Sequence, residues 1–95
     1  MHPYELMFII HPNVEIEPHD ALVERVQEMI KSQGGEVTDC KKWGKRRLAY
    51  EILDQREGFY VLINYTAEPH VTDELDRVLK ITEEVIRFMI VRSDD

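Results

Sequence analysis

The spacing of the apolar residues alternates between a strand period and a helix period along this chain, and this alternation constrains the fold more than any other feature. Between Tyr4 and Ile10, apolar residues fall on both sides of a two-residue repeat, which indicates a strand buried on both faces. From Pro18 to about Gln33 they recur every three or four positions, and the glycine pair that follows ends the predicted helix. The first third of the chain therefore predicts a central strand followed by a helix.

An extended segment follows, from Glu36 to about Leu53. Its apolar residues do not keep one parity across Gly44, and a glycine inside a strand often marks a bulge or a bend. The polar sequence from Asp54 to Gly58 predicts a turn, after which apolar residues alternate from Phe59 to Tyr65. We expect these two strands to form a hairpin.

The last third of the chain predicts a second helix and a final strand. Glu68-Pro69 breaks the third strand, and Thr72 offers a hydroxyl near the start of a helix that has acidic residues in its first turn. The apolar run from Val85 to Val91 is typical of a buried strand, with Arg87 directed outward.

The predicted order of elements is therefore β-α-β-β-α-β. This order is typical of the ferredoxin-like α+β fold, in which two helices cover one face of a four-stranded antiparallel sheet and leave the other face available. The 95 residues suffice for one modest hydrophobic core but not for two, so we expect a single domain over residues 1–95.

The charge of the chain is unevenly distributed. The formal net charge is −7, which by itself argues against a nucleic-acid partner. However, five of the twelve basic residues lie within the seven positions from Lys41 to Arg47, which contain no acid; we call this stretch the basic segment. It carries +5, so the remainder of the chain carries −12. The sequence predicts one positive region on an otherwise acidic domain.

The basic segment has the composition of a site for single-stranded or irregular RNA. Lysine and arginine meet phosphates, arginine adds a planar group for bidentate hydrogen bonds and stacking, and tryptophan offers a ring to unstacked bases. The candidate RNA-binding residues are Lys41, Lys42, Trp43, Lys45, Arg46 and Arg47. The same residues also suit a solvated edge strand, in which charged side chains prevent aggregation. The residues alone leave both interpretations open.

Aromatic residues on the predicted strands suggest a second kind of RNA site. The RNA-recognition motif has the same element order and stacks bases on aromatic residues of its open sheet face. The sequence Gly58-Phe59-Tyr60 reproduces only a fragment of that motif, so core packing or a protein interface is the favoured role of most strand aromatics. These are Tyr4, Tyr50, Phe59, Tyr60 and Tyr65. Burial of Phe59, Val61 and Tyr65 would count against the motif.

The sequence contains no evident catalytic or metal-binding arrangement. Its four histidines lack the close spacing of metal ligands, and Cys40 has no evident histidine partner, so we expect a packed strand thiol. A single cysteine forms no internal disulfide, which fits a reducing, cytosolic setting. We expect no cofactor, no small-molecule substrate and no enzymatic activity, although the fold alone also permits a small enzyme or a ligand-sensing dimer. The longest apolar run, from Leu6 to Ile10, is too short to cross a membrane, and no export signal is visible.

Over nearly its whole length the chain resembles the family of bacterial small-subunit ribosomal protein six. The most specific part of the resemblance is Trp43-Gly44-x-Arg46-x-Leu48-Ala49-Tyr50, with Gly58-Phe59-Tyr60 at the expected spacing. Further matches are Tyr4-Glu5, Asn13, Gly35, Ile81, Val85, Arg87 and Met89-Ile90-Val91.

This resemblance implies a structural protein of the bacterial small ribosomal subunit, located in the cytoplasm as part of the ribosome. It implies binding to the central domain of the small-subunit rRNA together with ribosomal protein eighteen, as a heterodimer. It makes Lys45, Arg46 and Arg47 candidates for rRNA contact, makes Leu48 and Tyr50 candidates for sheet packing, and leaves Trp43 for either use. Ribosomal protein eighteen is strongly basic in this family, so the acidic remainder of the chain would meet a partner of opposite charge.

Overall fold

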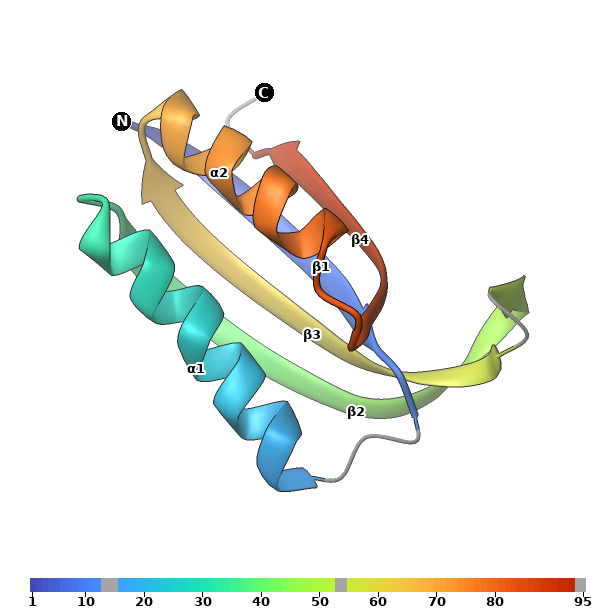
Figure 1. The fold of residues 1–95 in the computed structure, drawn as a ribbon. Helices are drawn as coiled ribbons and strands as arrows, with labels where there is room; N and C mark the ends of the chain where they lie inside the picture. The colour runs from blue at the N-terminus through green and yellow to red at the C-terminus, as the bar shows by residue number, and fades with distance from the viewer. Residues whose placement is uncertain (13–15, 53–54, 94–95) are drawn as a thin grey trace.

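The computed structural model describes residues 1–12, 16–52 and 55–93, and it confirms the predicted order of elements (Figure 1). The elements are β1 (His2–Ile10), α1 (Ile16–Ser32), β2 (Glu36–Ile52), β3 (Gln55–Ala67), α2 (Pro69–Lys80) and β4 (Val85–Arg92). None of the described helices is long and apolar enough to span a membrane.

The strands form one antiparallel sheet in the order β2-β3-β1-β4. β1 lies between β3 and β4, as expected of a strand that is apolar on both sides. Both helices pack on one face of the sheet, and neither covers the opposite face, which we call the open face (Figure 1). The predicted ferredoxin-like arrangement is therefore confirmed.

The core lies between the helices and the sheet. Every second residue of β1 and β3 faces the helices, which is why side chains such as Leu6 and Ile63 are completely inaccessible to solvent. Tyr65 is also buried, and its ring stacks on that of Tyr4 with the centroids 5.3 Å apart. Its hydroxyl shares a 2.8 Å hydrogen bond with the hydroxyl of Thr72, so the polar end of a buried side chain is satisfied.

This core buries, fully or in part, three β3 residues whose exposure the RNA-recognition motif would require. Val61 and Tyr65 are buried among the core residues, and Phe59 packs against the same cluster. The burial pattern therefore counts against a base-stacking platform of that type in the centre of the sheet.

The start of α2 differs from the prediction. The helix begins at Pro69, three residues before Thr72, with Glu68 in an extended conformation at the N-cap position and making no side-chain cap. Proline is favoured at the first helical position because that position needs no N–H donor. The Thr72 hydroxyl bonds Tyr65 instead of capping the helix, and the expected acidic first turn is absent because Asp73 and Glu74 lie further along.

The hairpin is longer than predicted. β3 begins at Gln55, so most of the polar stretch assigned to a turn belongs to a strand; Asp54 lies outside the described residues. The first helix likewise begins at Ile16, two residues before Pro18. In the hairpin, strand pairing outweighs the polar composition of residues 55–58 because their side chains need not be buried.

Candidate nucleic-acid interface

The basic segment lies on β2, an edge strand, at the point where β2 and β3 leave the rest of the sheet. β1 pairs with β3 only as far as Ile10, which lies opposite Phe59. Beyond this pair, β2 and β3 continue together to Ile52 and Gln55, and they project past the other elements in Figure 1. We call this two-stranded projection, residues 45–52 and 55–58, the ribbon.

A bulge inside the basic segment changes the direction of β2. The pairing register shifts between Lys42 and Gly44, so Trp43 is an extra residue without a partner on β3. Gly44 has φ of 79°, in the left-handed region that side-chain-bearing residues avoid. The bulge or bend expected at Gly44 is confirmed.

The three lysines of the segment form ion pairs. Lys42 Nζ lies 2.6 Å from the Asp20 carboxylate of α1. Lys45 Nζ lies 3.2 Å from Glu57, across the ribbon. Lys41 Nζ lies 3.6 Å from Asp39 on its own strand. Such exposed pairs are worth only about 0–1 kcal/mol each, so a phosphate can displace the carboxylates at small cost.

The two arginines of the segment differ from the lysines. Arg46 and Arg47 are exposed on the ribbon, opposite Gly58 and Glu57, and within residues 1–12, 16–52 and 55–93 neither forms an ion pair. Their guanidinium groups present several N–H donors in a plane, an arrangement suited to phosphate oxygens. These side chains are therefore the most available anion-binding groups of the segment.

The other residues of the stretch from Trp43 to Tyr50 differ in how far they are buried. The side chain of Trp43 is 48% exposed, so part of its indole is accessible from solvent. Leu48 is buried on the open face with Ile9 and Ile86, so its predicted packing role is confirmed. The side chain of Tyr50 lies outside the described residues.

Sequence reasoning missed one basic residue of this surface. Arg56 lies on the β3 side of the ribbon and is exposed, but the prediction placed it in a turn. The length of the predicted strand from Glu36 to about Leu53 could have revealed it. The antiparallel partner of a strand that ends near Leu53 must begin within a few residues of Leu53, which places Arg56 on that partner strand.

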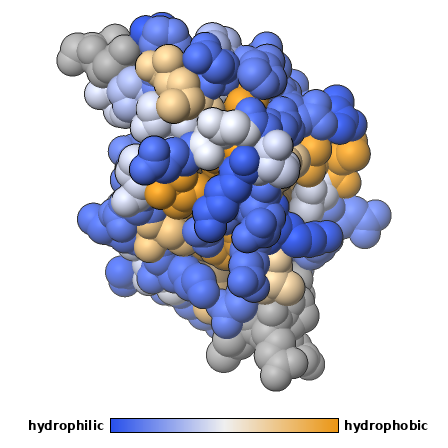
Figure 2. All heavy atoms as spheres, turned by 90° about the vertical axis from the view of Figure 1, so that its left-hand side faces the viewer, coloured by the Kyte–Doolittle hydropathy of each residue, from blue (hydrophilic) through white to orange (hydrophobic). Residues whose placement is uncertain are grey.

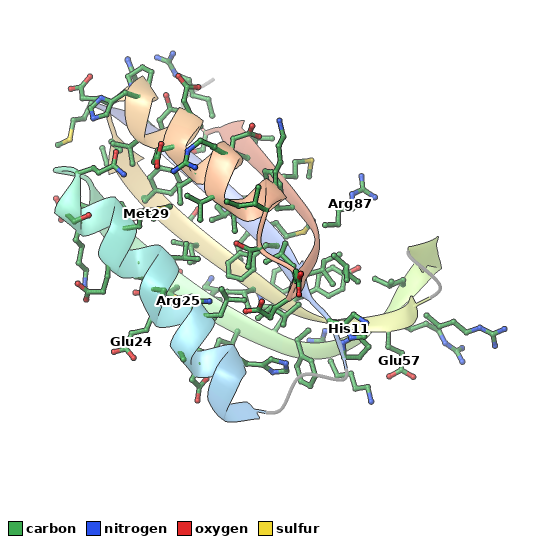
Figure 3. The ribbon with its side chains drawn as sticks, viewed as in Figure 1. His11, Glu24, Arg25, Met29, Glu57 and Arg87 are labelled. Atoms are coloured by element: carbon green, nitrogen blue, oxygen red, sulfur yellow. The ribbon has the colours of Figure 1, made fainter. Side chains whose placement is uncertain are left out.

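The rest of the surface is mostly polar. On the side of the molecule shown in Figure 2, hydrophilic side chains cover most of the surface and hydrophobic residues appear as separate patches. Figure 3 shows Arg87 extending from β4 away from both helices, as predicted, and Glu24 extending from α1. The basic segment remains the main concentration of positive charge in the sequence.

No catalytic arrangement emerges among the described residues. They contain no group of three histidine, cysteine or carboxylate side chains that could hold a metal ion. Cys40 is half-buried and accepts a 3.6 Å hydrogen bond from the Gln27 amide, and burial raises the pKa of its thiol, with Lys42 partly opposing the shift. A raised pKa lowers the thiolate population, so the structure supports the packed thiol expected from the sequence.

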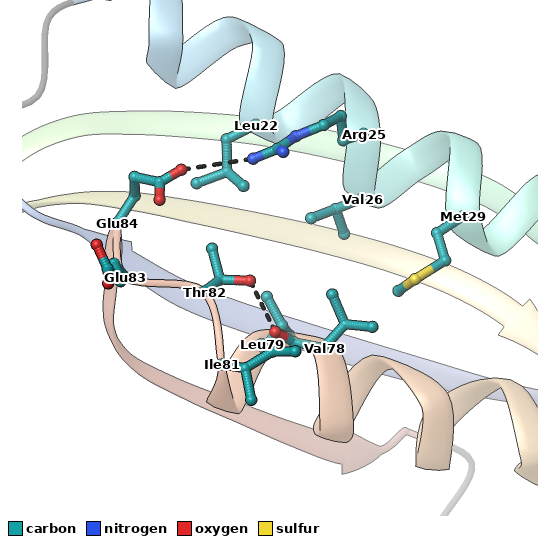
Figure 4. Close-up of a pocket in the computed structure, with 10 residues that line it drawn as sticks. All are labelled: Leu22, Arg25, Val26, Met29, Val78, Leu79, Ile81, Thr82, Glu83 and Glu84. Atoms are coloured by element: carbon teal, nitrogen blue, oxygen red, sulfur yellow. Dashed lines mark hydrogen bonds and ion pairs between the residues drawn. The ribbon is translucent and has the colours of Figure 1, made fainter.

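The cavity between the helices also lacks a reactive centre. It measures about 440 Å³ and lies between Val26 and Met29 of α1 and Leu79 of α2 (Figure 4). At one end Arg25 and Glu84 form a 3.4 Å ion pair. The Thr82 hydroxyl near it is engaged with the Val78 carbonyl, so no activated nucleophile faces this space.

Sequence comparisons connect this geometry with known proteins. The family model described as ribosomal protein S6 matches residues 3–92. The small ribosomal subunit protein bS6 of Exiguobacterium sibiricum is 50% identical over 94 residues, which are 99% of each chain. The protein of the same name from Carboxydothermus hydrogenoformans is 46% identical over 91 residues, 96% of this chain and 95% of that protein.

Solved structures agree. The crystal structure of 30S ribosomal protein S6 from Thermotoga maritima matches with a TM-score of 0.93 at 36% identity, covering 97% of this chain and 87% of that one. The C-terminal domain of the MgtC protein from Mycobacterium tuberculosis matches with a TM-score of 0.66 at only 10% identity, covering 99% and 89% of the two chains. The second likeness shows the fold alone, since one fold carries many functions.

Proposed function

Because this chain belongs to the ribosomal protein S6 family, whose members are structural, non-enzymatic components of the small ribosomal subunit, we propose that it binds the central domain of the small-subunit rRNA together with ribosomal protein eighteen, as a heterodimer. As part of the bacterial ribosome, the chain acts in the cytoplasm.

The observation that carries the RNA contact is the position of Arg46 and Arg47. Both are exposed on a ribbon that stands clear of the sheet, and neither is engaged by a carboxylate of the described residues. A projecting ribbon reaches into an irregular RNA surface, whereas the deep, narrow major groove of a regular RNA helix admits side chains poorly. The exposed ring of Trp43 at the base of the ribbon favours the same kind of target.

Two features support a basic protein partner. The chain outside the basic segment carries −12, which repels RNA unless a cationic partner screens it. In addition, the open face carries neighbouring apolar side chains: Met7 pairs with Leu62 on one side and with Met89 on the other, and Met89 is 47% exposed. A partner that covers this face would bury them, which favours association.

The proposal is tested by measuring binding to a central-domain rRNA fragment at several salt concentrations, with and without ribosomal protein eighteen. We expect binding to be salt-dependent and much tighter with the partner. The double variant Arg46→Gln, Arg47→Gln should reduce the slope of log K against log salt by about 1.4–1.8, because each lost phosphate contact contributes roughly 0.7–0.9.

The matched control is Arg77→Gln with Lys80→Gln, which removes the same charge from α2, where both cations are already paired with acids of their own helix. It should leave the slope unchanged. An unchanged slope for the Arg46 and Arg47 variant would exclude these residues from the RNA contact, and equal affinity without the partner would remove the heterodimer from the proposal.

A further inference from the structure

A second, smaller cavity borders the basic segment. It lies between the first turns of α1 and the strands β2 and β3, and its volume is about 210 Å³. Pockets for drug-sized ligands usually measure roughly 300–1,000 Å³, so this cavity suits a single small group. Its walls are almost entirely apolar and include His19, Val23, Lys42, Phe59, Tyr60 and Val61.

Charged residues are among those that line this mostly apolar cavity. Lys42 and Gly44 of the basic segment line the cavity together with Asp20 of α1, and the Lys42 ammonium pairs with the Asp20 carboxylate at 2.6 Å. An apolar interior favours a neutral occupant, whereas the basic segment, which supplies Lys42 and Gly44 to the lining and continues to Arg47, favours an anionic chain outside the cavity. The fitting ligand is therefore a neutral group attached to a negative backbone.

One residue that lines the cavity, His19, has a polar ring atom without a hydrogen-bond partner among the described residues. His19 is only 7% exposed, and within the described residues its Nε2 atom is buried and makes no hydrogen bond. Buried polar atoms of this kind are uncommon because losing their hydration is costly. The imidazole ring packs on Phe59 with the centroids 4.2 Å apart, so the site joins flat ring surfaces to an unused hydrogen-bonding group.

We infer that this cavity receives one unstacked nucleobase of the RNA strand whose phosphates the basic segment binds. A nucleobase is planar and neutral, carries donors and acceptors on its edge, and is attached to a phosphate backbone, so it matches the rings, the apolar walls, the His19 nitrogen and the adjoining basic segment together. The inference rests on the proposed RNA-binding function and adds a site for a base to a site for phosphates.

The test uses nuclear magnetic resonance of the full chain in its complex with ribosomal protein eighteen, with two RNA probes. One is a single-stranded hexanucleotide of mixed sequence, and the other is its abasic counterpart, which keeps the ribose phosphates and lacks the bases. The base-bearing probe should shift the backbone amides of Lys45 to Arg47 and also the methyl groups of Val23 and Val61. The abasic probe should shift the amides alone, because it has no ring to enter the cavity.

The outcomes distinguish the two proposals. If both probes shift the amides and neither shifts the methyl groups, no base enters the cavity and this inference is overturned, while the RNA-binding function stands. If neither probe shifts the amides of the basic segment, the RNA site itself is wrong, and the base site fails with it.

A matched pair of variants tests the cavity without removing a charge. Val23→Met extends a side chain into this cavity, whereas Val26→Met makes the same change on the same helix at a buried position that lines the other cavity. Val23→Met should weaken binding of the base-bearing probe at least about fivefold, the loss expected for one stacked base, and should leave its salt slope unchanged. Val26→Met should do neither.

If Val23→Met does not fold, His19→Phe replaces it, with His70→Phe at an exposed position of α2 as its control. His19→Phe keeps a ring and removes the hydrogen-bonding nitrogen, so it should likewise weaken binding of the base-bearing probe. If the cavity variant and its control bound the base-bearing probe equally well, the inference would be contradicted.

Discussion

At the scale of single residues, two glycines determine the path of the ribbon. Gly44 provides the left-handed conformation at the bulge, where an added Cβ would meet no other atom, so its role is conformational. Glycine is required at position 58 because of space and not because of backbone conformation. A Cβ there would overlap the Cγ2 methyl of Ile9, so the role of Gly58 is steric. The close approach of β3 to β1 beside the ribbon therefore requires a residue without a side chain.

Gly58→Ala should lower the free energy of unfolding by about 1–3 kcal/mol, the usual cost of forcing an extra carbon into a packed site. Ile9 is 2% exposed, and its branched methyl group is too close to the backbone to move away easily. Urea denaturation measures the change. In an Ile9→Ala background the penalty should be smaller, since the overlapping methyl group is gone, and an equal penalty in both backgrounds would refute the steric explanation.

The residue-level features that were predictable are those visible in local sequence. The loss of parity around Gly44 indicated the bulge, and the family resemblance indicated the packing role of Leu48. The ion pairs of Lys42 and Lys45 were not predictable, because Asp20 and Glu57 are distant in sequence and reach these lysines only through the fold. The availability of Arg46 and Arg47 relative to the lysines is therefore a property of the structure.

At the scale of elements, α2 is fixed by contact with the sheet as well as by its own N-terminus. Thr72 has the residue type of a helix cap, and sequence reasoning assigned it that role. In the structure Pro69 has already started the helix, and the Thr72 hydroxyl reaches Tyr65 of β3. The prediction failed because the buried phenol of Tyr65 requires a partner that is invisible in the local sequence.

Thr72→Val should destabilise the protein by about 1–3 kcal/mol, because it leaves the buried Tyr65 hydroxyl without its partner at nearly constant side-chain volume. Thr72→Ser keeps a hydroxyl and should cost much less. Chemical denaturation of both variants in the natural and Tyr65→Phe backgrounds separates the two roles. A capping role would give the same cost of Thr72→Val in both backgrounds, whereas the tyrosine contact predicts a small cost in the second.

At the scale of the whole molecule, opposite surfaces have different chemistry. The basic segment follows one edge of the sheet, the helices cover one face, and the open face carries apolar residues that include the half-exposed Met89 of the edge strand β4. The order of elements, and hence this layered arrangement, followed from the apolar spacing alone. Which apolar side chains remain exposed did not follow, because β1 and β4 are apolar on both sides and the sequence does not show what covers each side.

Met89→Glu should weaken association with ribosomal protein eighteen by tenfold or more, since it places a charge where the proposal buries an apolar side chain. The control is Ile81→Glu, at a residue that is 72% exposed beside the end of α2 and away from the open face. Both variants should fold, and calorimetric titration with the partner compares them. Equal association of the two variants would mean that the partner does not cover Met89.

The position of Trp43 at the bulge has a practical consequence for fluorescence measurements. Trp43 is the single tryptophan of the chain, and its indole lies half-exposed among the cations of the basic segment. Its fluorescence therefore originates from one place only, beside the surface proposed to meet RNA. The spectrum of the natural protein, with no added dye, should shift in wavelength or intensity when that surface is occupied, so the molecule carries a built-in optical reporter of its own binding.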